Sequence, residues 1–261
     1  MVIIVTKIRR PLKKCLKKRS KGMEYKRILA VGDIHGMYDK LIALMEKVKF
    51  DPEDDLLIFL GDYIDRGPQS LECLDYVMNL YKQYPERVIP LLGNHEAMCI
   101  NYYEYEARKR SLMDNFGKQM VLVWLDNGGK DTYKQFKTLK RPELQKRLRW
   151  MQMLSNHYQV GDYYFCHAGI QPYIPLKKQR ESDLLWMREG FFDLYDGRNG
   201  TIVVGHTPTQ ILKKKYWLDS DTPPTTPQFL NNNIILCDTG ACMDGGKLSC
   251  VDVLSRNFWQ E

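Results

Sequence analysis

The chain lacks the features expected of a membrane protein or of a disulfide-stabilised secreted protein. None of its apolar runs approaches the roughly 20 residues that a membrane-spanning helix needs. Its seven cysteines are an odd number and form no C-x-x-C pair, which argues against a disulfide framework. We therefore expect a cytoplasmic protein without a membrane span, whose cysteines stay reduced.

Acidic residues are absent from the first 22 residues, which hold nine lysines or arginines. Subtracting those nine charges from the net charge of +7 leaves −2, so only this segment is basic. Its charges follow a short apolar run instead of preceding it, unlike those of a secretory signal. We interpret residues 1–22 as a disordered extension, or as sequence upstream of a start at Met23. The alternative is an arm that binds nucleic acid or an acidic membrane surface.

Residues 23–261 show no internal repeat and no linker, and they predict one catalytic domain of α/β type. Apolar runs alternate with helical periodicity, which favours parallel strands joined by right-handed crossovers. The first part is predicted to contain strands at 27–31, 56–60 and 87–92 and helices at 38–48 and 71–84.

Residues 95–156 carry helical periodicity and predict a cap of three or four helices, with a break at Asn127-Gly128-Gly129. A role of this cap in substrate binding and a role in packing alone are both open. The remainder is rich in strand signals and contains one short helix capped by Ser182. We expect strands at 163–166, 201–204, 213–218, 234–237 and 248–254, the helix at 182–189 and a loop at 219–232.

One motif recurs along the chain: an apolar run ends in glycine, and the next residue has a side chain able to bind a metal. The residues that follow the glycine are Asp33, Asp62, Asn94 and His206. His167 follows a predicted strand in the same way, without the glycine. Open α/β sheets bind ligands at the carboxyl ends of their strands. Four of the five histidines (35, 95, 167 and 206) fall in such turns, whereas His157 does not and is interpreted as structural. The pattern predicts a polynuclear metal site.

Two metals need a shared ligand, and a carboxylate can bridge through its two oxygens. Our hypothesis is that Asp62 bridges, that Asp33 and His35 complete one metal, and that Asn94, His167 and His206 complete the other. Paired metals lie ~3.5–4 Å apart and clamp the attacking and leaving oxygens of an in-line displacement. Two divalent cations, two aspartates and one hydroxide leave about one positive charge, which suits a phosphate substrate.

Four further residues near these turns suit the chemistry of phosphate. An aspartate beside a histidine favours imidazolium, so our hypothesis makes His95 the acid that protonates the leaving group and Asp65 its orienting partner. Arg66, and Arg188 in LLWMRE, are expected to grip phosphate oxygens, with structural salt bridges as the alternative. Asp238, in Asp238-Thr239-Gly240, is expected to support the site rather than bind metal.

With these residues in view, the chain resembles the phosphoprotein phosphatase family of metallophosphoesterases, and most closely its bacterial and phage branch. The resemblance rests on motifs spread over residues 32–240 in the order of the family. They are GDIHG (32–36), GDYIDRG (61–67), GNHE (93–96), HAG (167–169) and GHTP (205–208), with weaker support from LLWMRE (184–189) and DTG (238–240).

The resemblance implies a calcineurin-like fold, with two mixed β-sheets packed face to face between helical layers. It implies a protein serine/threonine phosphatase that uses two divalent metal ions, with Mn²⁺ expected and Fe, Zn, Co or Ni as alternatives. The attack is in line, by a hydroxide that bridges the metals. The family motifs map onto the same metal ligands as above, onto His95 with Asp65 as the acid pair, and onto Arg66, Arg188 and Asn94 for phosphate. The expected partner is a phosphoserine or phosphothreonine protein, and the chain is expected to be a monomer.

Two alternatives stay open. A symmetrical dinucleoside-polyphosphate hydrolase has the same fold and resembles the chain around GDIHG and HAG, although GDYIDRG and GNHE favour the protein phosphatase. A binding module that acts through its basic extension, with a vestigial metal site, is the second. It predicts that removal of residues 1–22 abolishes function while His95→Asn does not.

Overall fold

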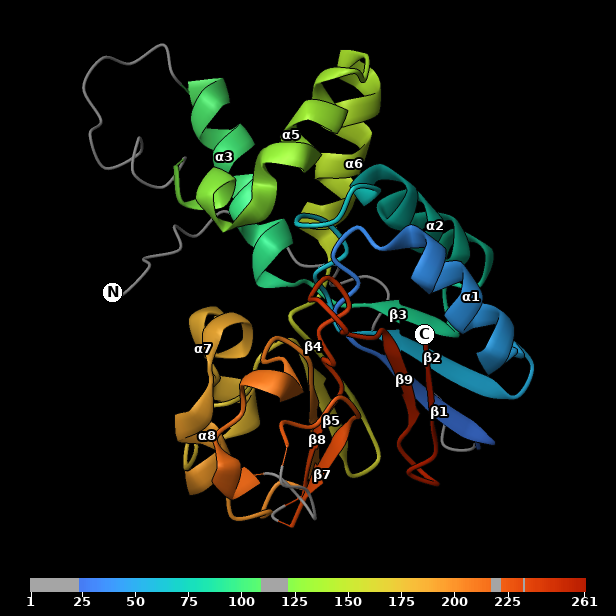
Figure 1. Ribbon diagram of the computed structural model, residues 1–261, viewed down its shortest axis with the longest axis vertical. Coiled ribbons are helices and arrows are strands. Elements are labelled where there is room, and N and C mark those ends of the chain that lie inside the picture. Colours follow the sequence, from blue (N-terminus) through green and yellow to red (C-terminus); the bar gives the residue numbers. More distant parts are fainter. Residues whose placement is uncertain (1–23, 109–121, 217–221, 232) are drawn as a thin grey trace.

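Two mixed β-sheets form the centre of the chain in the computed structural model, which describes residues 24–108, 122–216, 222–231 and 233–261 (Figure 1). The first sheet has the order β10-β9-β1-β2-β3 and the second the order β4-β5-β6-β8-β7. The strands of the first are β1 (Arg27–Val31), β2 (Asp55–Phe59), β3 (Val88–Pro90), β9 (Ser249–Asp252) and β10 (Phe258–Gln260). Those of the second are β4 (His157–Val160), β5 (Tyr163–Cys166), β6 (Thr201–Val204), β7 (Gln228–Leu230) and β8 (Ile234–Leu236).

Parallel pairing links the strands that precede the predicted metal ligands. β1, β2 and β3 pair in parallel, and so do β5, β6 and β8. Antiparallel strands complete both sheets: β9 and β10 in the first, β4 and β7 in the second. Parallel strands end at the same edge of a sheet, so this arrangement brings the turns that follow them together.

Alternating side chains along the strands define four layers. In β1, Ile28 and Ala30 pack in the core between the sheets, whereas Leu29 and Val31 face α1 (Tyr38–Val48) and α2 (Ser70–Gln83). The outer face of the second sheet packs in the same way on α7 (Glu181–Trp186) and α8 (Glu189–Leu194). The order helix, sheet, sheet, helix confirms the predicted calcineurin-like sandwich.

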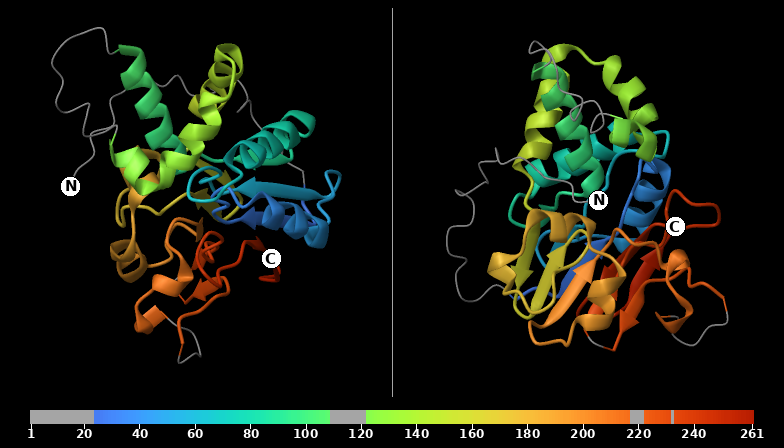
Figure 2. Two further views of the ribbon diagram at one scale, coloured as in Figure 1. Left: turned by 45° about the horizontal axis from the view of Figure 1, so that its top comes forward. Right: turned by 90° about the vertical axis from the view of Figure 1, so that its left-hand side faces the viewer.

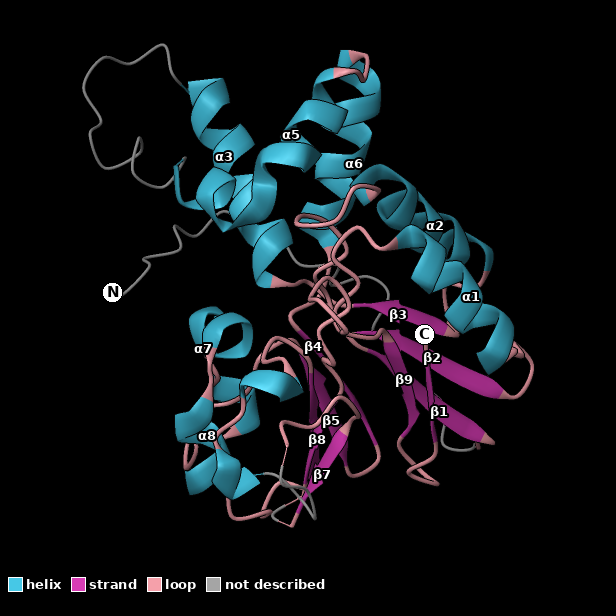
Figure 3. Ribbon diagram, in the orientation of Figure 1, coloured by secondary structure: helices cyan, strands magenta, loops and turns pink. Residues whose placement is uncertain are grey.

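The predicted helical cap stands over the edge where the strands end (Figures 1 and 3). It consists, within the described residues, of α3 (Asn94–Arg108), a π-helical turn (Leu125–Gly129), α5 (Lys130–Lys137) and α6 (Arg141–Met153). The predicted break lies inside the π turn, where Gly128 has φ +103° and interrupts the helix. Residues 1–22, interpreted above as an extension, lie outside the described residues.

Two predictions in the second half were wrong. Lys214–Tyr216 form a 3-10 turn instead of a strand, because the ring of Tyr216 packs on Phe192 and Lys215 pairs with Asp193. The predicted loop at 219–232 contains β7, which adds to the sheet edge by pairing with β8. Edge pairing of this kind depends on the neighbouring strand and leaves little trace in a polar, proline-rich sequence.

The short helix was also predicted with the wrong bounds. α7 begins at Glu181 and is capped by Asp183, whose carboxylate accepts the N–H of Arg180, so Ser182 lies inside the helix. A second helix, α8, follows at once and was not predicted, and neither were β4 and β10. No helix among the described residues is both long enough and apolar enough to cross a membrane.

Candidate metal centre

The turns that follow the parallel strands of both sheets meet beneath the cap helices (Figures 2 and 3). The predicted metal ligands lie in these turns, and none of them is more than 5% exposed. Among the described residues, two groups of potential ligand atoms lie within 4.8 Å of one another: His35, Asp62 and His95, and Asp62, His167 and His206. Asp33, predicted to bind a metal together with His35, belongs to neither group, and His95, predicted as the acid, takes its place in the first. Asp62 belongs to both groups, which is the placement that a bridging carboxylate needs.

The first group contains His35, Asp62 and His95. Asp62 Oδ2 lies 3.6 Å from Nε2 of His35 and 3.9 Å from Nε2 of His95. The backbone N–H of His95 donates to Asp62 Oδ1 at 3.0 Å and so holds that carboxylate in place. The sequence assigned His35 and Asp62 to a metal and His95 to proton transfer, and the structure brings all three together.

The second group contains Asp62, His167 and His206, and the amide of Asn94 lies among them. Asn94 Oδ1 lies 2.7 Å from His167 Nε2 and 2.9 Å from His206 Nδ1. His167 Nε2 is in turn 3.4 Å from Asp62 Oδ2. This group joins residues that follow strands of both sheets.

The tautomers of two histidines test whether these atoms suit a cation. His35 Nδ1 donates to the carbonyl of Ile64 at 3.0 Å, and His167 Nδ1 donates to the carbonyl of Leu60 at 2.9 Å. A carbonyl oxygen only accepts, so Nε2 of each neutral ring carries a lone pair that faces Asp62. Backbone carbonyls orient metal-binding histidines in this manner. The residues present therefore fit two divalent cations.

The buried carboxyl groups of Asp33 and Asp238 also indicate a cation site. Asp33 accepts the N–H of His206 on both carboxylate oxygens at 3.0 Å, and it lies near Asp62 and Asp238. Burial, and then these two carboxylates, raise the pKa of Asp33 well above its ordinary value. Burial also raises the pKa of Asp238 to about 6. Carboxylates gathered at such a depth are stabilised by cations among them.

The histidines around Asp62 have the opposite effect on its pKa. Burial by itself would raise the pKa of Asp62, but the nearby rings of His167, His95 and His35 hold it well below its ordinary value. Burial, followed by the charge of His95, lowers the pKa of His35, and burial lowers that of His206 in the same way. An ionised Asp62 can bind metals, and the lowered pKa values of His35 and His206 keep lone pairs on their rings available for the same purpose.

The backbone adopts an unusual conformation at the residues that carry the site. His35, Asp62, Asp65, Arg66 and His206 all have φ between +49° and +74°. Such left-handed conformations cost about 1–3 kcal/mol each for residues other than glycine and cluster at functional sites.

Two glycines are required by close approach to carboxylates. A Cβ at Gly93 would lie 2.1 Å from Asp62 Oδ1, and one at Gly205 would lie 2.2 Å from Asp33 Oδ1. The glycine of the recurring motif thus leaves space for a carboxylate that comes from another turn.

His95 and Asp65 form a buried pair, as the sequence predicted. His95 Nδ1 lies 2.8 Å from Asp65 Oδ2, so Nε2 points toward Asp62 and the metal ligands. The backbone N–H of Asp65 donates to the hydroxyls of Ser70 and Thr132 at 3.0 Å each. His95 Nε2 is therefore the ring nitrogen within reach of a group bound at the site, which is the placement that proton transfer requires.

The two predicted phosphate-binding arginines lie on opposite sides of the histidines. Arg66 Nη1 is 2.9 Å from His35 Nε2, and its Nη2 is 3.2 Å from His95 Nε2. Arg188 Nη1 donates at 3.2 Å to the carbonyl of His206 and to the hydroxyl of Thr207. Both guanidinium groups thus reach the site, and within the described residues Arg66 does not form the carboxylate salt bridge that was its alternative.

Glu96, the last residue of GNHE, was quoted in the motif but received no role. Its two carboxylate oxygens accept four backbone N–H groups at 2.8–3.2 Å. These are the N–H groups of Asp62, Tyr63, Ile64 and Gly93. Burial, and then the charges of Asp62 and Asp65, raise the pKa of Glu96 to about 8. Glu96 supports the turn that carries Asp62, and an acidic residue directly after His95 was the available signal.

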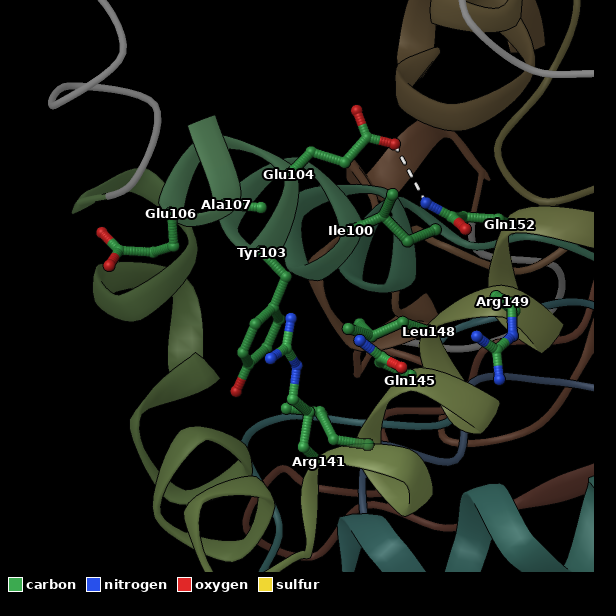
Figure 4. A pocket seen from close by; sticks show the side chains of 11 residues that line it. Ile100, Tyr103, Glu104, Glu106, Ala107, Arg141, Gln145, Leu148, Arg149 and Gln152 are labelled. Atoms are coloured by element: carbon green, nitrogen blue, oxygen red, sulfur yellow. Dashed lines mark hydrogen bonds between the residues drawn. The ribbon is translucent and has the colours of Figure 1, made fainter. Parts of the chain in front are cut away.

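A separate pocket of about 410 Å³ lies between α3 and α6 (Figure 4). Its walls include Ile100 and Tyr103 from α3 and Leu144 and Leu148 from α6, and Gln152 donates to Glu104 across it at 3.0 Å. None of the predicted site residues lines it. His157, interpreted as structural, stacks on Tyr164 with a centroid distance of 5.2 Å and belongs to neither ligand group.

Comparison with known proteins agrees with the fold and shows the family of the chain. Residues 26–235 match the family described as "Calcineurin-like phosphoesterase". The chain is 29% identical over 201 residues to a "Serine/threonine-protein phosphatase 1" of Salmonella typhimurium, a match that covers 73% of this chain and 82% of the relative.

Other relatives carry a different name. Over 101 residues the chain is 41% identical to a symmetrical bis(5'-nucleosyl)-tetraphosphatase of Buchnera aphidicola, a match that covers 36% of this chain and 35% of that relative. The chain thus spans about a third of the length of this second relative. A solved structure of a protein serine/threonine phosphatase from Saccharomyces cerevisiae has a TM-score of 0.59 at 18% identity and covers 90% of this chain and 78% of that chain.

Proposed function

The chain belongs to the calcineurin-like phosphoesterase family, and from this premise we propose that it is a metal-dependent protein serine/threonine phosphatase. The observation that carries the proposal is the sharing of Asp62 by two groups of ligand atoms, with the buried His95–Asp65 pair at their edge. A phosphate monoester needs cations at its oxygens and an acid at its leaving group, and these residues suit both requirements.

Asp33, His35, Asp62, Asn94, His167 and His206 would hold the cations, for which we propose Mn²⁺, with Fe, Zn, Co or Ni as alternatives. When bound, the pair of ions supplies the nucleophile by lowering the pKa of water and neutralises charge on the phosphoryl oxygens. Asp62 is held for this task by the N–H of His95 and by Glu96, which accepts the N–H of Asp62. Imidazole and carboxylate donors suit all of these metals, so the donor set by itself does not choose among them.

His95 would donate the proton that the leaving serine or threonine oxygen requires. Asp65 Oδ2 accepts the hydrogen bond of Nδ1, and the proton to be transferred would sit on Nε2, which faces the site, once Arg66 no longer donates to that nitrogen. Arg66 would turn from the two histidine nitrogens to the phosphate oxygens, because a dianion attracts a guanidinium more strongly than a neutral ring nitrogen does. Arg188 would approach from the side of His206, and Asn94 would complete the contacts to phosphate.

Support for a protein substrate comes from the extent of the similarity. The match to the Salmonella phosphatase covers 82% of that relative, whereas the match to the Buchnera tetraphosphatase covers 35%. The alternative function, symmetrical hydrolysis of a dinucleoside polyphosphate, is favoured by the higher identity of that shorter match. Both activities use the same metal centre, so the leaving group distinguishes them.

A paired assay tests the proposal. The protein is stripped with a chelator, supplied with Mn²⁺, and given a phosphothreonine peptide or diadenosine tetraphosphate. His95→Asn should lower peptide turnover by at least about 100-fold, as expected for loss of a general acid. His157→Asn is the matched control, because its ring lies outside both ligand groups, and it should leave turnover unchanged.

Three outcomes would count against the proposal. Faster cleavage of the dinucleotide would assign the chain to the alternative function. Full activity of His95→Asn would overturn the role of the acid. Absence of metal-dependent turnover of either substrate would overturn the mechanism and favour the binding-module alternative.

A further inference from the structure

One segment of the cap, Trp124 to Thr132, holds the two residues Asp65 and Arg66 through three hydrogen bonds. The indole Nε1 of Trp124 donates to Asp65 Oδ2 at 2.8 Å. The backbone N–H of Asp65 donates to the hydroxyl of Thr132, and that of Arg66 donates to the carbonyl of Gly128, both at 3.0 Å. The cap therefore contacts the acid pair directly, in addition to packing beside the strand ends.

The hydrogen bond from Trp124 restrains the orientation of the Asp65 carboxylate. Trp124 Nε1 and His95 Nδ1 both lie 2.8 Å from the same oxygen, Oδ2. The other oxygen, Oδ1, is buried and has no hydrogen-bond partner among the described residues. With Trp124 removed, a single bond to His95 would hold the side-chain oxygens, and the carboxylate could rotate about its χ2 angle.

Trp124 itself has little freedom to move. Its side chain is fully buried, and its ring packs on Tyr102 with a centroid distance of 4.9 Å. A Cβ at Gly129 would lie 2.6 Å from Nε1, so the chain passes directly over the indole. An indole N–H only donates and a carboxylate oxygen accepts, which makes the indole a suitable fixed partner for Asp65 Oδ2.

From these contacts we propose that Trp124 is a positioning residue, which fixes the Asp65 carboxylate and thereby the orientation of the His95 ring. The inference rests on the proposed function of His95 as the acid. It gives the cap a task in the reaction: residues 124–129, which follow α3 in the chain, set the direction in which His95 Nε2 presents its proton. A misplacement of about 1 Å in such a group lowers a rate by on the order of 100-fold.

The leaving group provides a readout that separates positioning from stability. The alkoxide of threonine is a poor leaving group and requires a proton, whereas p-nitrophenolate is stable as an anion and leaves without one. A defect confined to the acid therefore lowers kcat for a phosphothreonine peptide and largely spares p-nitrophenyl phosphate. General loosening of the fold or loss of metal lowers both rates by the same factor.

The experiment compares three variants of the full chain with Mn²⁺ bound. Trp124→Phe removes the N–H and keeps an aromatic ring, and we expect kcat for the peptide to fall about 10- to 100-fold. For p-nitrophenyl phosphate we expect a fall of less than about threefold. Phe136→Leu is the matched control, because Phe136 is a fully buried cap residue that does not bond Asp65, and its two rates should change together. Gly129→Ala, which would push the indole, should reproduce the selective loss if Trp124→Phe does not fold.

The results distinguish the positioning role of Trp124 from the acid role of His95. Equal losses on both substrates in Trp124→Phe and in Gly129→Ala would overturn the positioning role. His95→Asn, measured alongside, tells the two proposals apart. If it spares the peptide reaction, the proposed acid is wrong. If it is selective for the peptide and the Trp124 variant is not, only the present inference is wrong.

Discussion

The two ligand groups around Asp62 differ in how far apart their supports lie along the chain. In the first group, the bonds from His35 to Ile64 and from His95 to Asp65 join residues 29 and 30 positions apart. In the second, His167 reaches Leu60 and Asn94 across 107 and 73 positions. The first group belongs to turns of one sheet, and the second forms only when the two sheets pack. The difference shows that the turns of one sheet build the side with His35 and His95, whereas the packing of the two sheets builds the side with His167 and His206.

The largest effect is expected at Asp62, because both ligand groups share this residue and it cannot be assigned to one of them. Asp62→Asn removes the charge that is common to both groups, and we expect activity to fall by at least about 10²- to 10³-fold. Metal content, measured by mass spectrometry after dialysis, should drop below that of any variant in a single group. Retention of two tightly bound ions would contradict the sharing of Asp62.

The next effect tests the support of the turn that carries Asp62. Glu96→Leu leaves four buried backbone N–H groups without their acceptor, and at 1–3 kcal/mol for a buried unsatisfied group we expect a loss of at least about 3 kcal/mol in the free energy of unfolding. Urea denaturation measures this loss. Glu96→Gln retains one oxygen and should lose less, so equal losses would show that the N–H groups find other partners.

A pair of matched variants sharpens the distinction between the groups. His35→Asn and His206→Asn each remove one imidazole, and asparagine tolerates the left-handed backbone at both positions. Each variant should lose one metal equivalent, and activity should fall at least about 10- to 100-fold. Loss of both ions from either variant would mean that the groups behave as one cooperative site.

The smallest effect concerns the pH dependence of the metal-free protein. Burial raises the pKa of Asp238 from an ordinary 3.8 to about 6 and raises that of Asp33 in the same direction. A carboxyl with a raised folded-state pKa contributes stability that is complete below the unfolded pKa and is lost as the pH rises through the folded pKa. With the ions chelated, the free energy of unfolding of the natural chain, taken relative to that of Asp238→Asn, should therefore fall by at least about 1 kcal/mol between pH 4 and pH 7. The comparison cancels His35 and His206, whose lowered pKa values act in the opposite direction. Mn²⁺ should abolish this fall, and an unchanged slope with Mn²⁺ would contradict a cation among these carboxylates.

The fold was predicted best where one periodicity dominates the sequence. The runs before Asp33, Asp62 and Asn94 are buried strands within one or two residues of their predicted bounds, because a fully apolar run has few alternatives in a large domain. β10 and the 3-10 turn at 214–216 were missed because their conformation depends on neighbours. β10 exists through its pairing with β9, and the turn through the packing of Tyr216 on Phe192.

The site shows the same division. Residue type and glycine spacing sufficed to select the residues that the structure gathers, because strand ends of a parallel sheet meet at one edge. They gave no sign of the four N–H groups on Glu96 or of the indole of Trp124 on Asp65. Those bonds join residues from different turns, and periodicity carries no information about such pairs.

The sequence by itself determined the chemistry of this protein: its motifs carry the donor atoms, the acid pair and the family. The tertiary structure alone decided the geometry: which carboxylate is shared, which tautomers face it, and which cap residue steadies Asp65. The physical reason is that donor chemistry belongs to each side chain, whereas hydrogen-bond partnership requires residues that are distant in the chain to meet in one place.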